Sequence, residues 1–140
     1  MQSYVYKGSK RIYETPTKEK KSKPLFSNLA FILCGSYPIN GFKSNGSKLF
    51  ADHNGSTLLD YHLDLINSVC ESPEIIVTSG VSTKDLLKHQ RKSEFIIVEN
   101  QLYEFSNPAE DLRLGLLALR SPNVIYIDSG FMPTVKTLKY

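Results

Sequence analysis

Residues 29–66, LAFILCGSYPINGFKSNGSKLFADHNGSTLLDYHLDLI, hold the pattern that decides the fold. An apolar run from Leu29 to Cys34 ends at Gly35, and a polar loop rich in Gly, Ser and Asn follows it as far as Ser47-Lys48. Asn54-Gly55 predicts a turn, and apolar residues then recur at helical spacing. We therefore expect a buried strand, a glycine-bearing loop, a turn and an amphipathic helix.

The loop after this strand has the composition of a phosphate-binding loop. A buried strand followed by such a loop often presents backbone N–H groups and a lysine to an anion. Gly35 and Ser36 stand at the start of the loop and Lys48 stands at its end. We predict that these three residues bind phosphate, although a solvated loop lysine is the simpler interpretation of Lys48.

Three further apolar runs follow, each separated from the last by a helical pattern. They are EIIVT at 74–78, FIIV at 95–98 and VIYI at 124–127. Buried strands that alternate with helices predict an α/β fold with a doubly wound, mostly parallel sheet and helices on both faces. Ligands of such sheets bind beyond the carboxyl ends of the strands.

The helix ends and faces can also be predicted. Ser82 is expected to cap the second helix, and Asn107 with Pro108 is expected to begin the third. In the third helix we expect Gly115 to allow close packing and one stripe to be buried, formed by Leu112, Leu116 and Leu119.

Length and composition indicate a single domain of ordinary globular type. The chain has 140 residues, no apolar run near the ~20 residues of a membrane span, and no hydrophobic leader at its start. Cys34 and Cys70 fit free buried thiols better than a disulfide. We therefore expect a protein of the cytoplasm, or of a particle assembled there, that does not bind membranes. The spacing of the three histidines indicates no metal site.

The positive charge is concentrated near the N-terminus. Residues 1–25 hold seven basic and two acidic side chains, whereas the whole chain has a net charge of +3. We divide the chain into a basic, tyrosine-bearing arm, 1–27, and a domain, 28–140. The arm is either a flexible tail or a segment that orders against a partner. Its candidate partner-binding residues are Tyr4, Tyr6, Lys7, Lys10, Arg11 and Tyr13.

The order of these motifs resembles the nucleotidyltransferases that join a nucleoside triphosphate to a sugar phosphate or choline phosphate, including the molybdopterin-guanylyl type. The resemblance covers residues 29–133 and lies in four segments. These are ILCG with the downstream SKL, NGSTLLDYHLDLI, ENQLYEFSNPAEDLRLGL and NVIYIDSG. It implies the N-terminal half of a nucleotidyltransferase fold, and a nucleotide site that includes Gly35, Ser36, Lys48, Asn100 and Tyr103.

The resemblance also implies a reaction, and this sequence departs from the residues that the family uses for it. In this family a phosphate oxygen attacks the α-phosphorus with the help of Mg²⁺, a lysine and an arginine. Where the family has Gly-x-Gly-x-Arg, residues 35–40 (GSYPIN) supply one glycine and no arginine, and the family's metal-binding aspartate aligns with Gly130, leaving Asp128 as a weak metal ligand. Active members also continue beyond the point that matches Tyr140.

Two functions follow from this comparison. We expect a catalytically silent, nucleotidyltransferase-like domain that requires no cofactor. It would be reused as a binding or assembly module, in a viral particle or another large complex, and tethered by the arm to a protein partner or a second copy. The alternative is an active Mg²⁺-dependent nucleotidyltransferase whose site is completed by another subunit. Nucleotide is a candidate ligand, and nucleic acid bound by the arm is a lesser one.

Overall fold

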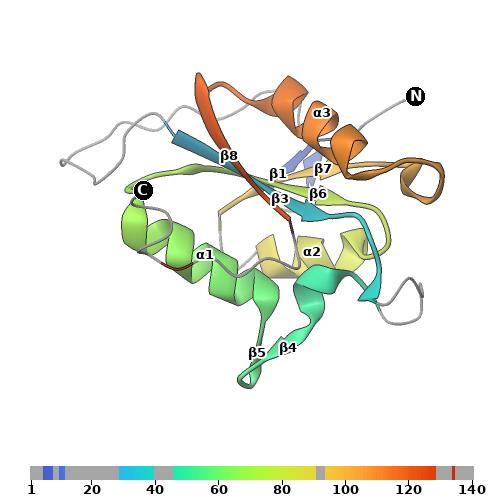
Figure 1. Cartoon of the computed structure of the whole chain (residues 1–140), viewed down its shortest axis with the longest axis horizontal. Coiled ribbons are helices and arrows are strands. Elements are labelled where there is room, and N and C mark those ends of the chain that lie inside the picture. The colour runs from blue at the N-terminus through green and yellow to red at the C-terminus, as the bar shows by residue number, and fades with distance from the viewer. Residues whose placement is uncertain are drawn as a thin grey trace.

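The computed structural model of the chain describes residues 5–7, 10–11, 29–39, 46–90, 94–128 and 134. Figure 1 shows one central sheet between helices. The helix α3 (Pro108–Ala118) covers one face, and α1 (Leu58–Val69) and α2 (Thr83–Gln90) cover the other. The predicted doubly wound architecture is confirmed.

Four parallel strands form the centre of the sheet. They are β3 (Leu29–Gly35), β6 (Glu74–Ser79), β7 (Ile96–Glu99) and β8 (Asn123–Ile127), and their order in space is β7-β6-β3-β8. Each neighbouring pair is parallel, so a helical crossover must separate the strands in the chain. The first two crossovers lead away from β3 in one direction, and the third leads to β8 on its other side. The order therefore reverses between β3 and β8, where ligands of such sheets bind.

The core is divided into two layers by the sheet. Side chains of alternate residues in a strand point to opposite faces. Phe31 and Leu33 pack with the buried residues of α1 and α2, whereas Ile32 packs with Leu114 of α3. Burial on both faces explains why the strands appear in the sequence as continuous apolar runs.

The helix α1 begins with a side-chain cap. Thr57 lies in extended backbone at its N-cap, and its hydroxyl accepts a hydrogen bond from the Asp60 N–H. A small hairpin of β4 (Asp52–His53) and β5 (Ser56–Thr57) precedes it. Its turn places Asn54 at φ 52° and Gly55 at φ 81°, the left-handed conformations that an Asn-Gly hairpin turn requires.

The helix α3 confirms two predictions and corrects a third. Asn107 caps it through a hydrogen bond from the Ala109 N–H. A Cβ on Gly115 would lie 2.9 Å from Ile32 Cδ1, so the glycine does permit close packing. The predicted stripe is wrong at Leu116, which is 45% exposed. The helix instead turns Asp111, Leu114 and Gly115 toward the sheet, because a glycine brings that side of the helix closest.

Two short strands were not predicted. The strand β1 (Val5–Lys7) pairs antiparallel with β7 through Val5↔Val98 and Tyr6↔Ile97, and β2 (Lys10–Arg11) pairs with β1. They are too short to form a recognisable pattern in the sequence, and their pairing depends on a distant strand. Part of the segment interpreted as an arm therefore lies against the domain's own sheet.

Among the described helices, none is both long and apolar enough to span a membrane.

Candidate functional site

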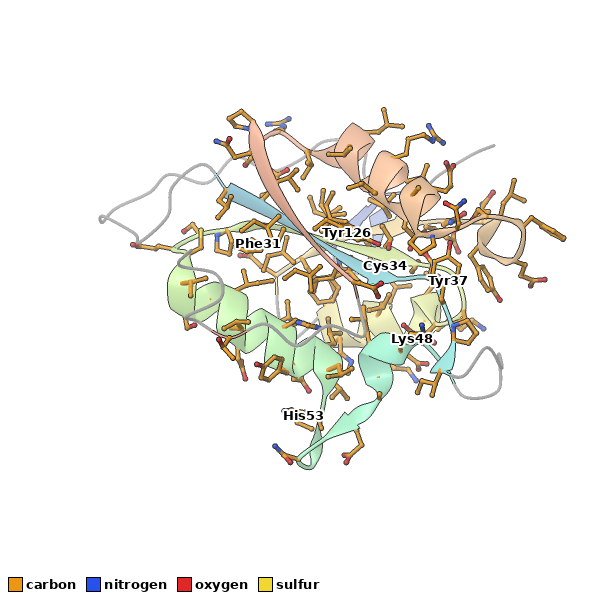
Figure 2. All side chains as sticks on the ribbon, viewed as in Figure 1. Phe31, Cys34, Tyr37, Lys48, His53 and Tyr126 are labelled. Carbon is orange, nitrogen blue, oxygen red and sulfur yellow. The ribbon has the colours of Figure 1, made fainter. Side chains whose placement is uncertain are left out.

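The carboxyl ends of β3 and β8 lie next to each other and bring several predicted residues together. Gly35 ends β3, Ser36 follows it, and Asp128 follows β8. The 3-10 helix η3 (Lys48–Phe50) returns to the same place, since the Lys48 N–H donates to the Tyr37 carbonyl at 3.0 Å. Figure 2 shows Tyr37 and Lys48 near the end of β3, with His53 away from them on the β4–β5 hairpin.

The backbone amides on either side of residues 40–45 are hydrogen bonded within the protein. The Gly35 N–H donates to the Thr78 hydroxyl at 3.2 Å, and the Ile39 N–H donates to the Gly46 carbonyl at 2.9 Å. Ser82 lies directly before α2, at the predicted cap position, and its hydroxyl accepts the Ser47 N–H at 2.8 Å. These amides therefore shape the loop and are not directed at an open anion site.

A carboxylate that the sequence analysis did not single out lies at the centre of the site. Asp111, in the first turns of α3, has an exposed fraction of 0%. It accepts hydrogen bonds from four neutral donors, which lie in β3, in β6 and in the loops after β3 and β7. The donors are Cys34 Sγ at 3.0 Å, Thr78 Oγ1 at 2.8 Å, Ser36 Oγ at 2.8 Å and Asn100 Nδ2 at 2.8 Å. Four donors match the four lone-pair sites of a carboxylate.

Asn100 carries this network into the loop after β7. Its second amide hydrogen is directed to the Ser106 hydroxyl at 3.0 Å, and its Oδ1 accepts the Leu102 N–H at 3.1 Å. The Asn100 N–H donates to the Ser79 carbonyl at 2.7 Å. One buried side chain thus holds the 3-10 helix η4 (Tyr103–Phe105) and the start of α3 against the sheet.

The Tyr103 ring packs against Gly80 in the loop after β6. A Cβ on Gly80 would lie 2.5 Å from Tyr103 Cγ and 2.7 Å from the Ser36 carbonyl oxygen. The Val81 N–H donates to that same carbonyl at 3.4 Å. The loops after β3, β6 and β7 therefore form one connected surface at the carboxyl end of the sheet.

Burial and the Asp111 charge alter the titration of the groups around this carboxylate. Burial, and then the nearby carboxylate, raises the pKa of the Cys34 thiol to about 12, so the thiol stays protonated and donates to Asp111. Burial also raises the pKa of Tyr37 and of Tyr126, whose hydroxyl lies near Cys34. Figure 2 shows Tyr126 and Cys34 close together beneath α3.

The predicted nucleotide- and metal-binding side chains fall into two groups. Ser36 and Asn100 are fully buried and hydrogen bonded within the protein, so they support the surface from below. Lys48 and Tyr103 are partly exposed, and Asp128 is exposed at the end of β8. In the described part of the chain, His, Cys, Asp and Glu side chains form no group of three suited to a metal ion. Gly130 lies outside the described residues.

Four of the candidate arm residues belong to described strands of the sheet. Tyr6 and Lys7 belong to β1, and Lys10 and Arg11 to β2, beyond β7 at the sheet edge opposite β8. Tyr4 and Tyr13 lie outside the described residues. Among the described residues, the strands β1 and β2 are separated in the sheet from β3 and β8 by β7 and β6.

Comparison with known proteins gives structural likeness only. No protein-family model matches the sequence, and no curated protein matches it. A nucleotidyl transferase from Methanothermobacter thermautotroptrophicus superposes on 79% of this chain with a TM-score of 0.65 and 14% sequence identity. The CTP:phosphocholine cytidylyltransferase from Streptococcus pneumoniae covers 72%, with a TM-score of 0.56 and 20% identity.

The chain spans about half the length of these structures, 55% of the first and 44% of the second. Likeness at this level of identity concerns the arrangement of strands and helices and not the chemistry of the site. The chain has a nucleotidyltransferase-like, Rossmann-like α/β fold.

Proposed function

We propose that this chain is a nucleotidyltransferase-like binding module that takes a nucleoside phosphate at the β3–β8 switch point and does not transfer it. The observation that supports this proposal most strongly is that the Asp111 carboxylate is fully hydrogen bonded within the protein. This carboxylate lies under the surface where phosphates would sit, but four protein donors occupy its lone pairs. It is therefore a structural acceptor, and Asp128 is left as the exposed acid at the end of β8.

Lys48 supports binding at this place. Its backbone is held beside the exit of β3 by the Tyr37 carbonyl, and its side chain is partly exposed. An ammonium group near the carboxyl ends of parallel strands suits the phosphates of a ligand bound at a switch point. The structural neighbours are named as a nucleotidyl transferase and a CTP:phosphocholine cytidylyltransferase, which favours this ligand class.

The alternative is the active enzyme whose site is completed by another subunit. It draws support from the position of Asp128, because β8 pairs directly with β3 and ends at Ile127, opposite Leu33 and two residues before Gly35. Mg²⁺ prefers carboxylate oxygens in octahedral geometry and usually keeps several waters, so Asp128 would need acidic partners from elsewhere.

One experiment separates the two functions. Incubate the protein with Mg²⁺, each nucleoside triphosphate, and phosphocholine or sugar 1-phosphates, and measure pyrophosphate release. We expect no release above the protein-free blank. Turnover that is lost in Asp128→Asn would establish the alternative and overturn the silent module.

Binding is measured separately by the thermal shift that each Mg²⁺–nucleotide complex produces. We expect a rise in melting temperature that Lys48→Ala strongly reduces. Lys88→Ala is the matched control, because it removes the same charge from the last turn of α2, at the opposite end of the parallel strands. Equal shifts in both variants would contradict a role for Lys48.

A further inference from the structure

The buried Asp111 carboxylate has no evident reason to be charged if its role is only to fill the core. Its neighbours on the buried side of α3 are Leu114 and Gly115, which pack against an apolar layer. Within the described residues, no lysine or arginine pairs with it; its partners are the four neutral donors. A buried charge without a cation is costly, and a well-packed apolar residue often serves stability as well.

The two carboxylate oxygens hold different parts of the molecule. Oδ2 accepts from Cys34 and Thr78, which lie within β3 and β6. Oδ1 accepts from Ser36 and Asn100, which lie just beyond the carboxyl ends of β3 and β7. The Oδ2 contacts thus join strand to helix, and the Oδ1 contacts fix the starts of two loops.

Those two loops carry the exposed part of the candidate site. The Ser36 carbonyl accepts the Val81 N–H and lies under Gly80, against which the Tyr103 ring packs. Asn100 fixes the backbone of Leu102, directly before Tyr103. Both loops would therefore relax together if the Oδ1 contacts were lost.

We propose that Asp111 is the positioning residue of this site: through Oδ1 it holds Ser36 and Asn100, and so sets the spacing of the loops that receive a nucleoside phosphate. This inference depends on the proposed binding function. It adds that ligand affinity, and not only stability, depends on two hydrogen bonds accepted by a side chain that does not touch the ligand.

The test compares Asp111→Asn with two matched variants. Asparagine keeps the size but replaces one acceptor oxygen with a donor, so two of the four donors lose their acceptor. Cys34→Ala removes one Oδ2 contact and leaves both loop contacts in place. Glu110→Gln makes the same charge change one residue away, at a partly exposed side chain paired with Arg113.

Affinity for the Mg²⁺ complexes of the nucleoside triphosphates is measured by calorimetry, well below the melting temperature of every variant. Losing a hydrogen bond to a charged group typically alters an equilibrium by about tenfold. We expect Asp111→Asn to weaken binding by about that factor or more, and Cys34→Ala and Glu110→Gln to stay within about twofold. Equal affinities in Asp111→Asn and Cys34→Ala would overturn the positioning role and leave the binding function intact.

Hydrogen exchange gives a readout that needs no ligand. In Asp111→Asn the amides of Val81 and Leu102 should exchange faster relative to those of α1, whereas in Cys34→Ala their ratio should be unchanged. Uniform acceleration in Asp111→Asn would mean that the residue serves global stability alone, which contradicts the proposal. Absence of nucleotide binding in the unsubstituted protein would overturn the proposed function and this inference with it.

Discussion

The residues around Asp111 show how one buried carboxylate changes the chemistry of its neighbours. Cys34 is a thiol in an apolar strand, yet burial and the adjacent negative charge make it a hydrogen-bond donor that resists ionisation. Burial raises the pKa of Tyr126 and Tyr37 as well. The protein in its folded state therefore holds these protons more tightly than the unfolded chain does.

The first prediction concerns stability at alkaline pH. Cys34 has a pKa of 9.0 without the fold and about 12 within it, so its contribution is complete below pH 9 and is lost as the pH rises toward 12. The slope approaches about 1.4 kcal/mol per pH unit for one group. The free energy of unfolding in urea should fall over this window, and less steeply in Cys34→Ser.

Serine keeps a hydrogen-bond donor for Asp111 but does not ionise in this pH range. The Cys34→Ser variant therefore removes the ionisation of the thiol and keeps the hydrogen bond. The two tyrosines titrate with the same sign at higher pH, so some decline should persist in Cys34→Ser. Parallel curves for the two proteins between pH 9 and 11 would contradict the assignment to Cys34.

A second prediction concerns the close contact between α3 and the sheet. Alanine favours a helix over glycine by about 1 kcal/mol, but a Cβ at position 115 would lie 2.9 Å from Ile32 Cδ1. Overpacking of a filled core costs about 1–3 kcal/mol. Gly115→Ala should therefore lower the melting temperature, and Ile32→Val, which removes Cδ1, should partly restore it in the double variant. A stabilised single variant would show that the contact is loose.

At the scale of elements, the edge of the sheet at β7 is covered by the N-terminal segment. Val98 and Ile97 pair through their backbones with Val5 and Tyr6. An uncovered edge strand exposes a row of N–H and C=O groups and invites pairing with another chain. The basic segment therefore has a structural role in addition to any partner that it binds.

The third prediction follows from this pairing. Deletion of residues 1–27 should lower the melting temperature and promote self-association through β7, as measured by calorimetry and light scattering. A variant with Lys7, Lys10 and Arg11 changed to Gln keeps the backbone and removes the charge, so it should stay monomeric and stable. An unchanged melting temperature after deletion would support the interpretation of the whole segment as a dispensable arm.

At the scale of the molecule, the two apolar layers share one sheet. Neighbouring residues of β3 pack into different layers, Phe31 with α1 and Ile32 with α3. Both layers pack on the same strand. Loss of either layer would expose one face of β3 to water and weaken the strand that the other layer needs, so the layers should unfold together.

The fourth prediction is that the protein unfolds in one cooperative step. Leu63→Ala in the α1 layer and Leu114→Ala in the α3 layer should each cost about 2–5 kcal/mol. In both variants circular dichroism and tyrosine fluorescence should give coincident transitions. Separate transitions in the Leu114→Ala variant would show that the α3 layer is independent.

The sequence by itself determined the parallel strands, the three crossover helices and the cap at Asn107. Apolar runs and capping residues act over a few neighbouring positions, so they can be identified in one dimension. The pairing of β1 with β7 and the burial of Asp111 were decided by the tertiary structure. Asp111 fits the first turn of any helix, and only the approach of α3 at Gly115 places its carboxylate over donors from β3, from β6 and from the loops after β3 and β7.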